Sequence, residues 1–516
     1  MDSEKIVQRL QTIAAETRRR CPLALRPGLS VDLYPPSILA LDGHRFFIGA
    51  QGIRKFLWIV APSTDSPLSG EFQGEWLDSG GGIKRCAQTH GNAIALRCRF
   101  GFTRPVPIGL HSSFGLGDRL GLANPAHLRA IAGSGMKLIL AQQSIRELER
   151  TQRTPDQVMD AASWAVFQEG YREGFGADAD HLKTPEDIDL MIRAGFTMFT
   201  FDPSAYVVNE AAHLPAAEAA ERAQRLPWDT LEDRLETFLA RYVERPFHIA
   251  DDFCIRPSRE ETLRALVKYG GAIAHAVRLC GHLDASYPDP NYEVELSVDE
   301  TDTPTSPLEH FLIASELRRL GVRIISLAPR FIGDFEKGID YKGDLEVFKR
   351  EYRRHAQIAA CLGPYKLSIH SGSDKFAVYR AVGSLRIGSV HVKTAGTSYL
   401  EALRTVAAME PELFRDILRF ARPLYEGERR TYHVSAELNR VPLPEDYPDA
   451  RLQEFLDQDD ARQVLHVTFG KVLTARDSVG DFLFRSRLLD CLTRHEAEHY
   501  DFVEKHIRRH LEPFKD

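Results

Sequence analysis

The sequence has few cysteines and no closely spaced cysteine pair. Its seven cysteines are scattered singly along 516 residues, so neither a disulfide framework nor a zinc ribbon is expected. A chain of this length can bury a large core without cross-links. No run approaches the roughly 18 apolar residues of a membrane-spanning helix. The charged N-terminal segment lacks the apolar centre of a secretory signal, so we expect a cytoplasmic protein without a membrane partner.

The sequence also lacks an excess of positive charge. Its 66 lysines and arginines are outnumbered by 73 aspartates and glutamates, which gives a net charge of −7. Because a nucleic-acid-binding face needs clustered positive charge, no nucleic-acid partner is expected. A dinucleotide-binding GxGxxG motif is missing as well, since the glycines of residues 115–121 have the wrong spacing. We therefore expect no nucleotide cofactor.

Residues 1–104 predict a small α/β module. An amphipathic N-terminal helix is followed by short β-like runs at residues 46–48, 56–60 and 94–100. The three glycines at 80–82 are typical of a hairpin turn or a loop. Histidines and carboxylates are not clustered here, so we assign no chemistry to this module.

Residues 105–425 repeat a pattern of a short apolar run followed by a helix signal. Short continuous apolar runs are typical of buried parallel strands. The eight runs lie at residues 106–111, 136–141, 175–180, 196–201, 292–298, 322–328, 365–369 and 389–392. Strands that alternate with helices in this way predict an α/β fold, a (β/α)8 barrel. A doubly wound sheet is the alternative, and the missing dinucleotide motif argues against it.

Helix signals separate these runs. Residues 154–157 read Thr-Pro-Asp-Gln, with an N-cap threonine, a proline at the first helical position and the glutamine of a capping box. The same cap recurs at Thr184, and Gly195 is placed to end that helix. A helical insertion is predicted near 205–290, and a helical C-terminal extension over 426–516.

Polar side chains follow every run at the end where a (β/α)8 barrel carries its active site. A polar group after one strand is ordinary, but a polar group after each of eight strands indicates an active site. The candidates are Asp118, Arg119, Gln142, Gln143, Ser144, Asp180, His181, Lys183, Glu295, Arg330, His370, His391 and Lys393.

Three histidines are the candidate ligands of a divalent metal cation. His370 and His391 follow neighbouring runs, and His181 would reach in from the third run across the barrel mouth. Three imidazoles with an open fourth position form a normal catalytic metal set, although a single histidine at a strand end is more often structural. Glu295 or Asp180 could replace one ligand. A histidine-rich site suits zinc, with manganese, nickel or cobalt as alternatives.

Asp180 and Glu295 form the predicted acid–base pair. They come from the third and fifth runs, which leaves room for a substrate between them, and carboxylates near a cation can be tuned for proton transfer. The alternative roles are support of a metal-binding histidine for Asp180 and an ion pair with Arg330 for Glu295. The acidic residues 299–302 fit a second metal site less well than a cluster at a helix N-terminus.

Cations at the predicted barrel mouth indicate a small anionic substrate. The cations that would hold a carboxylate or phosphate through charge-assisted hydrogen bonds are Lys183, Lys393, Lys375, Arg330 and Arg119. Gln142, Gln143 and Ser144 suit sugar hydroxyl groups, and Asp118 lies beside Arg119 in the predicted substrate-binding set.

Long segments around these positions resemble the tagaturonate/fructuronate epimerase family. The similar segments are residues 113–121, 141–147, 164–170, 176–183, 297–306, 330–341, 369–376, 391–401 and 432–436. Motifs of this length are specific, and the match is loosest over the first hundred residues.

The resemblance implies a metal-dependent isomerase of hexuronate catabolism that interconverts D-tagaturonate and D-fructuronate. It implies that Asp180 accepts a proton, Glu295 donates one and His181 binds the metal. The chemistry is expected to be retro-aldol cleavage or migration of the carbonyl. A metal-dependent ketose or ketose-phosphate epimerase or aldolase is the alternative enzyme, since residues 371–373 could hold phosphate. A non-catalytic sugar-binding barrel is disfavoured by the complete set of polar groups, and the oligomeric state is left open.

Overall fold

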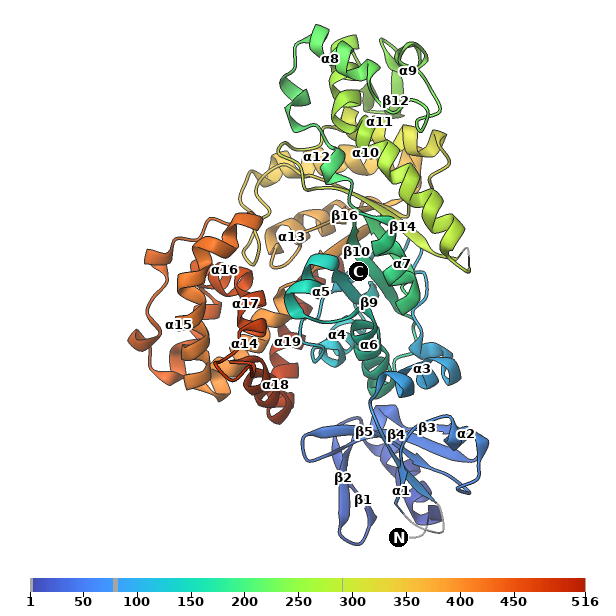
Figure 1. The fold of residues 1–516 in the computed structure, drawn as a ribbon, viewed down its shortest axis with the longest axis vertical. Helices are drawn as coiled ribbons and strands as arrows, with labels where there is room; N and C mark the ends of the chain where they lie inside the picture. Colours follow the sequence, from blue (N-terminus) through green and yellow to red (C-terminus); the bar gives the residue numbers. More distant parts are fainter. Residues whose placement is uncertain (1–2, 78–81, 290, 516) are drawn as a thin grey trace.

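The computed structural model describes residues 3–77, 82–289 and 291–515. Figure 1 shows a β-rich module in blue, a central barrel, a helical insertion beyond one end of the barrel and a group of helices in orange and red beside it. The barrel is closed and parallel, in the strand order β10-β11-β14-β15-β16-β17-β8-β9. The predicted α/β class and (β/α)8 barrel are therefore confirmed.

The barrel strands follow the predicted apolar runs, with one exception. They are β8 (Ser113–Leu116), β9 (Lys137–Ser144), β10 (Gly176–Leu182), β11 (Met198–Phe201), β14 (Glu293–Val298), β15 (Ser326–Pro329), β16 (Lys366–Ile369) and β17 (Val390–Thr394). The first run was placed wrongly, because residues 106–111 form no strand. Pro105 and Pro107 flank Val106 and have no N–H to donate to a strand ladder, so the strand begins only at Ser113.

The helices that surround the barrel begin and end close to the predicted signals. They are α4 (Asn124–Ile131), α5 (Ile145–Thr151), α6 (Pro155–Glu169), α7 (Pro185–Ala194), α11 (Pro307–Arg319), α12 (Leu345–Leu362), α13 (Phe376–Leu385) and α14 (Thr397–Met409). Capping boxes at Thr154 and Thr184 are both present, and Gly195 closes α7 in a left-handed conformation. The predicted caps are confirmed.

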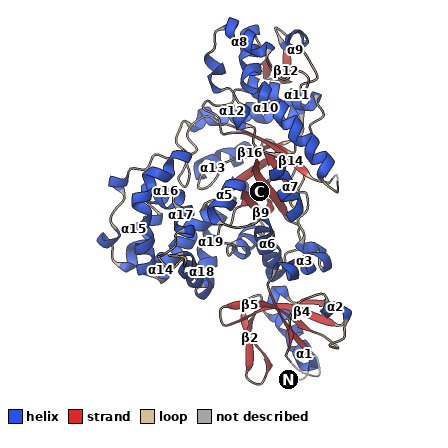
Figure 2. Ribbon diagram, viewed as in Figure 1, coloured by secondary structure: helices blue, strands red, loops and turns tan. Residues whose placement is uncertain are grey.

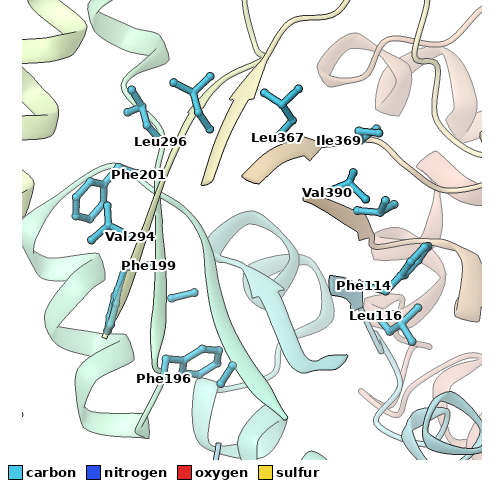
Figure 3. Packing of buried hydrophobic residues seen from close by; sticks show 14 of the residues in the cluster. Phe114, Leu116, Phe196, Phe199, Phe201, Val294, Leu296, Leu367, Ile369 and Val390 are labelled. Atoms are coloured by element: carbon cyan, nitrogen blue, oxygen red, sulfur yellow. The ribbon is translucent and has the colours of Figure 1, made fainter. Parts of the chain in front are cut away.

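Alternation along the barrel strands separates apolar from polar side chains. Phe199, Phe201, Val294 and Leu296 belong to the buried apolar cluster that packs the strands against the helices (Figure 3). The intervening residues of these strands, such as Glu295, face the other side of the sheet, which is the barrel interior. The sequence therefore places an apolar shell outside the strands and a polar set inside them.

The N-terminal module is a seven-stranded antiparallel sheet with helices α1 (Ser3–Glu16), α2 (Pro67–Gly70) and α3 (His90–Arg99). Its strands are β1 (Cys21–Arg26), β2 (Leu29–Leu33), β3 (Leu39–Leu41), β4 (His44–Gln51), β5 (Arg54–Val60), β6 (Glu75–Trp76) and β7 (Ile83–Ala87). The predicted strand at 94–100 was wrong: these residues lie largely in α3, because the Thr89 side chain caps that helix by accepting from the Asn92 N–H. Residues 80 and 81 of the predicted glycine turn lie outside the described residues.

The remaining chain is mostly helical, as Figure 2 shows in blue. The insertion comprises α8 (Ala216–Gln224), α9 (Leu235–Tyr242), the hairpin of β12 (Phe247–Ala250) and β13 (Phe253–Ile255), and α10 (Arg259–Ser286). The C-terminal helices are α15 (Pro411–Glu428), α16 (Asp459–Val467), α17 (Phe469–Thr474), α18 (Arg485–Arg494) and α19 (Glu496–Leu511). The boundaries at 104/105 and 425/426 stay predictions. Among the described residues, no helix has the length and apolarity needed to cross a membrane.

The C-terminal tail packs tightly on α13 at Gly383. A Cβ atom added at Gly383 would overlap the carbonyl oxygen of Pro513, whereas one added at Gly281 in α10 would meet open space. Alanine is favoured over glycine in helices by about 1 kcal/mol, so Gly281→Ala should preserve or raise the thermal midpoint. We expect Gly383→Ala to lower the midpoint by about 2–4 °C or more, measured by circular dichroism. Equal midpoints for the two variants would contradict this packing.

Candidate active site

One lysine organises the polar interior of the barrel. Lys393 on β17 is buried, and its Nζ lies 2.7 Å from Asp178 Oδ2, 2.8 Å from Asp180 Oδ1 and 2.8 Å from Glu295 Oε1. It also donates to Thr200 Oγ1 at 2.6 Å. The strands β10, β11, β14 and β17 are thereby linked through a single ammonium group. This cation offsets much of the repulsion among the three buried carboxylates.

The carboxylates of this group have different pKa values. Burial raises the pKa of Asp178 to about 6, against the pull of Lys393 and with the help of Asp180 and Glu295. For Asp180, burial is outweighed by Lys393, His181 and His370, which lower its pKa to about 2. Lys393 and His370 likewise outweigh burial at Glu295 and hold its pKa well below the usual range. Asp180 and Glu295 are therefore ionised at neutral pH.

His181 is turned toward the site by an irregular strand end. Its φ of 55° is left-handed, and the pairing of β10 with β11 shifts register between Ala179 and Leu182. Such a bulge re-aims a side chain. The His181 Nδ1 lies 3.3 Å from Asp202 Oδ2, and its Nε2 lies 3.8 Å from Asp180 Oδ1.

His370 follows β16 and lies beside His181, with 5.2 Å between the ring centroids. Its Nδ1 lies 3.3 Å from Asp299 Oδ1, and its Nε2 lies 2.7 Å from Glu295 Oε1. Burial opposes protonation of both imidazoles, but Asp299 and Glu295 raise the pKa of His370 to about 9. Asp180 and Asp202 raise the pKa of His181 to about 10.

His391 differs from the other two histidines. Its Nδ1 lies 3.2 Å from the backbone oxygen and 3.0 Å from the hydroxyl oxygen of Ser113. In the tautomer with the proton on Nδ1, that nitrogen donates to the backbone oxygen. The Nε2 atom then bears a lone pair, and it is buried without a hydrogen-bond partner among the described residues. Burial lowers the pKa of His391 to about 3, so this imidazole is neutral.

The structure brings together one set of metal-binding groups at this site. Ligand atoms of His181, His370 and Asp299 all lie within 4.8 Å of one another. His391 is not part of this set. The prediction that residues 299–302 cluster at a helix N-terminus was wrong, since α11 begins at Pro307 with Ser306 as its cap.

A cavity of about 280 Å³ opens above these groups at the C-terminal end of the barrel. Of the residues predicted from the sequence, those that line it are Arg119, Gln142, Ser144, Asp180, His181, Arg330, His370 and Lys393. Glu295 is fully buried and does not line the cavity.

Three predicted substrate-binding residues lie away from this cavity. The Asp118 carboxylate accepts four backbone N–H groups, from Leu120 to Asn124, and so shapes its own loop. Lys183 is half-exposed and lies 3.2 Å from Asp202 Oδ2. Gln143 is buried, and its amide atoms have no partner among the described residues.

Sequence reasoning missed several residues that line the cavity. Arg146 and Glu147 come from α5, and Lys337 comes from the segment between β15 and α12. Tyr432 and His466 come from the C-terminal extension. The segments 330–341 and 432–436 carried the family resemblance, but no spacing rule places these residues over a barrel mouth.

A second set of buried ligand-type groups, Asp374, His506 and His510, lies between α13 and α19. The His510 Nε2 accepts the Asp374 N–H at 3.0 Å, and Nδ1 of the same ring bonds the backbone oxygen of His506 at 3.0 Å. Arg462 pairs with Asp374 at 2.6 Å. With both nitrogens of His510 engaged, these residues form a structural hydrogen-bond network.

The Lys393 group yields a test of its charge balance. Lys393→Met leaves three buried carboxylates without their cation, and we expect it to cost roughly 3–5 kcal/mol of stability. Asp178→Asn added to Lys393→Met removes one of the repelling charges and should recover part of that loss. Thermal unfolding of the two variants measures the difference. If the double variant is no more stable than Lys393→Met, the repulsion argument is wrong.

Comparison with known proteins shows which family the chain belongs to. The family model described as tagaturonate epimerase matches residues 34–514. The tagaturonate/fructuronate epimerase of Thermotoga maritima is 43% identical over 485 residues, which are 94% of this chain and 97% of that protein. Two crystal structures of the fructuronate-tagaturonate epimerase of Cohnella laeviribosi, one with glycerol bound and one native, match with TM-scores of 0.88 and 39% identity over 99% of each chain. The chain belongs to the tagaturonate epimerase family and is an epimerase, an enzyme of the isomerase class.

Proposed function

We propose that this enzyme interconverts D-tagaturonate and D-fructuronate with the help of a divalent metal cation. The observation that carries the proposal is the pair of ionised carboxylates, Asp180 and Glu295, held by Lys393 beside three histidines. The names of the relatives from Thermotoga maritima and Cohnella laeviribosi support the choice of substrates.

The substrates limit the chemistry that the site must perform. Both are 5-keto-hexonates that differ in configuration at C3, which is two bonds from the ketone carbon. The hydrogen on C3 is not acidified by the carbonyl, so direct removal of that proton would face a prohibitive barrier. Retro-aldol cleavage of the C3–C4 bond avoids this step. The aldehyde fragment can then turn over and add back through its other face.

Asp180 is the proposed base for cleavage. It lines the cavity and is ionised, so it can accept the proton of the 3-hydroxyl group. As that proton leaves, C3 becomes an aldehyde and the electron pair of the C3–C4 bond passes into an enediolate over C4 and C5. On re-addition the pair returns to a C3–C4 bond, and Asp180 gives the proton back to O3.

Glu295 is the proposed proton donor, acting below the cavity floor. Because it is ionised and does not line the cavity, it would act through its ion pair with Lys393, which does. On cleavage a proton would pass from the Lys393 ammonium to the enediolate oxygen on C5, and on re-addition it would return to Lys393. Gln142 and Ser144 line the cavity and are proposed to bind sugar hydroxyl groups. Migration of the carbonyl along the chain would use the same carboxylates, so the route needs a direct test.

The donor groups fit a metal cation. Each of the three histidines has its Nδ1 held by a partner: Asp202 for His181, Asp299 for His370 and Ser113 for His391. Metal-binding histidines typically bind through one nitrogen while the other is fixed in this way. We therefore propose the three Nε2 atoms as ligands, with Asp299 as an outer support. The Nε2 of His370 would exchange its contact with Glu295 Oε1, at 2.7 Å, for the cation. A bound divalent cation would stabilise negative charge on the sugar oxygens as a Lewis acid.

The activity and its route can be tested in one experiment. Purified enzyme is stripped with EDTA, reloaded with zinc, manganese, nickel or cobalt, and incubated with D-tagaturonate in D2O. We expect fructuronate only after reloading, with no deuterium at C3 or C4 in its NMR spectrum. Deuterium at C4 without C3–C4 cleavage would reject the retro-aldol route. No turnover with any of the metals would reject the proposed function.

The ligand set can be tested by metal content. We expect His391→Ala to lose its bound metal after dialysis, measured by mass spectrometry of the elements. Asp299→Asn should still bind metal, with an affinity about 10–100-fold weaker, because it removes only an outer support. The reverse outcome, metal retained in His391→Ala and lost in Asp299→Asn, would assign the third position to Asp299.

A further inference from the structure

A uronate substrate brings a carboxylate into the cavity, and that carboxylate needs a cation. The cationic side chains that line the cavity, histidines aside, are Arg119, Arg146, Arg330, Lys337 and Lys393. Since C1 is two bonds from C3, the carboxylate must lie close to the reacting carbon. The question is which of these cations can accept another anion.

Two of the cations are already engaged by carboxylates of the protein. Lys393 is shared among Asp178, Asp180 and Glu295. The Arg119 Nε donates to Glu147 Oε1 at 2.9 Å, and its guanidinium stacks on the Phe469 ring. Lys393 is therefore fully shared. Arg119 shares its charge with Glu147, although its Nη1 has no hydrogen-bond partner among the described residues.

The two other arginines are engaged at the edge of the cavity. Arg146 pairs with Glu300 at 3.4 Å, and both side chains are 38% exposed, so this pair is solvated. Arg330 donates to the backbone oxygen of Thr301, which fastens the segment after β14. Arg330, like Lys337, has no carboxylate within ion-pair distance among the described residues, but its guanidinium is already tied to that backbone oxygen.

Lys337 is different. Its Nζ donates to Ser371 Oγ at 2.6 Å, and no carboxylate oxygen among the described residues lies within ion-pair distance of it. Ser371 directly follows His370, so this ammonium lies next to the proposed metal-binding histidine. Burial and the nearby Arg146 lower the pKa of Lys337, and Asp299, Glu300 and Glu147 offset that shift only in part, so an anion seated beside Lys337 would stabilise its charge.

The backbone around Lys337 is firmly held. The buried Lys375 donates its Nζ to the backbone oxygens of Glu336 and Ser373, at 2.6 and 3.0 Å. The Glu336 side chain accepts hydrogen bonds from Ser435 and Gln463, both at 2.7 Å. Lys337 is thus presented from a fixed segment, which reduces the entropy lost when a ligand binds.

We propose that Lys337, with the hydroxyl group of Ser371, binds the substrate carboxylate and selects uronates over neutral sugars. This inference rests on the proposed function. It replaces Lys183, Lys393 and Arg119 as the group that recognises the carboxylate. In the retro-aldol route, the aldehyde fragment is the one that carries C1, so the same contact would keep that fragment in the cavity while it turns.

The test compares Lys337→Met with Lys349→Met, a lysine of α12 that pairs with Glu346 at 2.8 Å and does not line the cavity. The probes are D-mannonate, a hexonate, and D-mannitol, its neutral counterpart, with binding followed by calorimetry. We expect Lys337→Met to bind D-mannonate at least tenfold more weakly than wild type and to lose its preference over D-mannitol. Lys349→Met should match wild type within twofold.

Kinetics give the second measurement. In Lys337→Met the KM for D-tagaturonate should rise at least tenfold, with an unchanged thermal midpoint. Unchanged D-mannonate binding and KM in Lys337→Met would overturn the proposal, and so would a loss of discrimination confined to Arg330→Met. A failure of the proposed function would look different, because the wild type would then turn over no tagaturonate with any metal. The calorimetric comparison of D-mannonate with D-mannitol would still test the role of Lys337 in that case.

Discussion

The ammonium group of Lys393 is the interaction on which the barrel interior depends. It faces three carboxylates and a threonine hydroxyl from three neighbouring strands of the barrel sheet, deep enough that solvent cannot screen their repulsion. A buried charge left without its partner costs several kcal/mol, so these residues constrain one another. The apolar shell outside the strands buries these charges. Burial raises the free-energy cost of an unpaired charge, and the close packing of the shell makes the arrangement rigid.

The same charge balance gives the carboxylates and the histidines different roles in the proposed mechanism. Carboxylates tied to Lys393 are less available as metal ligands, which leaves them free to exchange protons with a substrate. The histidines have their Nδ1 atoms fixed by Asp202, Asp299 and Ser113, so we propose their Nε2 atoms as the groups that bind a cation. For His370 the cation would take the place of Glu295, which now contacts that Nε2 atom. In the proposed mechanism, the acid–base carboxylates therefore lie beside the metal-binding histidines, and the cation does not need the carboxylate oxygen atoms.

Local sequence patterns were enough for the barrel and for the residues at its strand ends. The apolar runs predict the strands because a two-residue period separates the outer Val392 from the inner Lys393. The pattern wrongly predicted strands at two places. Prolines interrupt the apolar run at residues 106–111, and residues 94–100 lie largely in a helix whose N-terminus is capped by a threonine. The pattern also wrongly predicted that Asp299 lies at a helix N-terminus, because residue types do not show how far an acidic cluster lies from the start of the next helix.

The residues that sequence reasoning missed share one property: their position depends on contacts between distant segments. Lys337 faces the cavity because the buried Lys375 holds its segment through backbone oxygens, which any residue type provides. Tyr432 and His466 reach the cavity only because the C-terminal helices fold back beside the barrel. Residue type predicts what chemistry a side chain can perform, but tertiary packing decides which cation is left without an anion. For that reason the strand ends point to the proposed catalytic groups, whereas the proposed carboxylate-binding group emerges only from the structure.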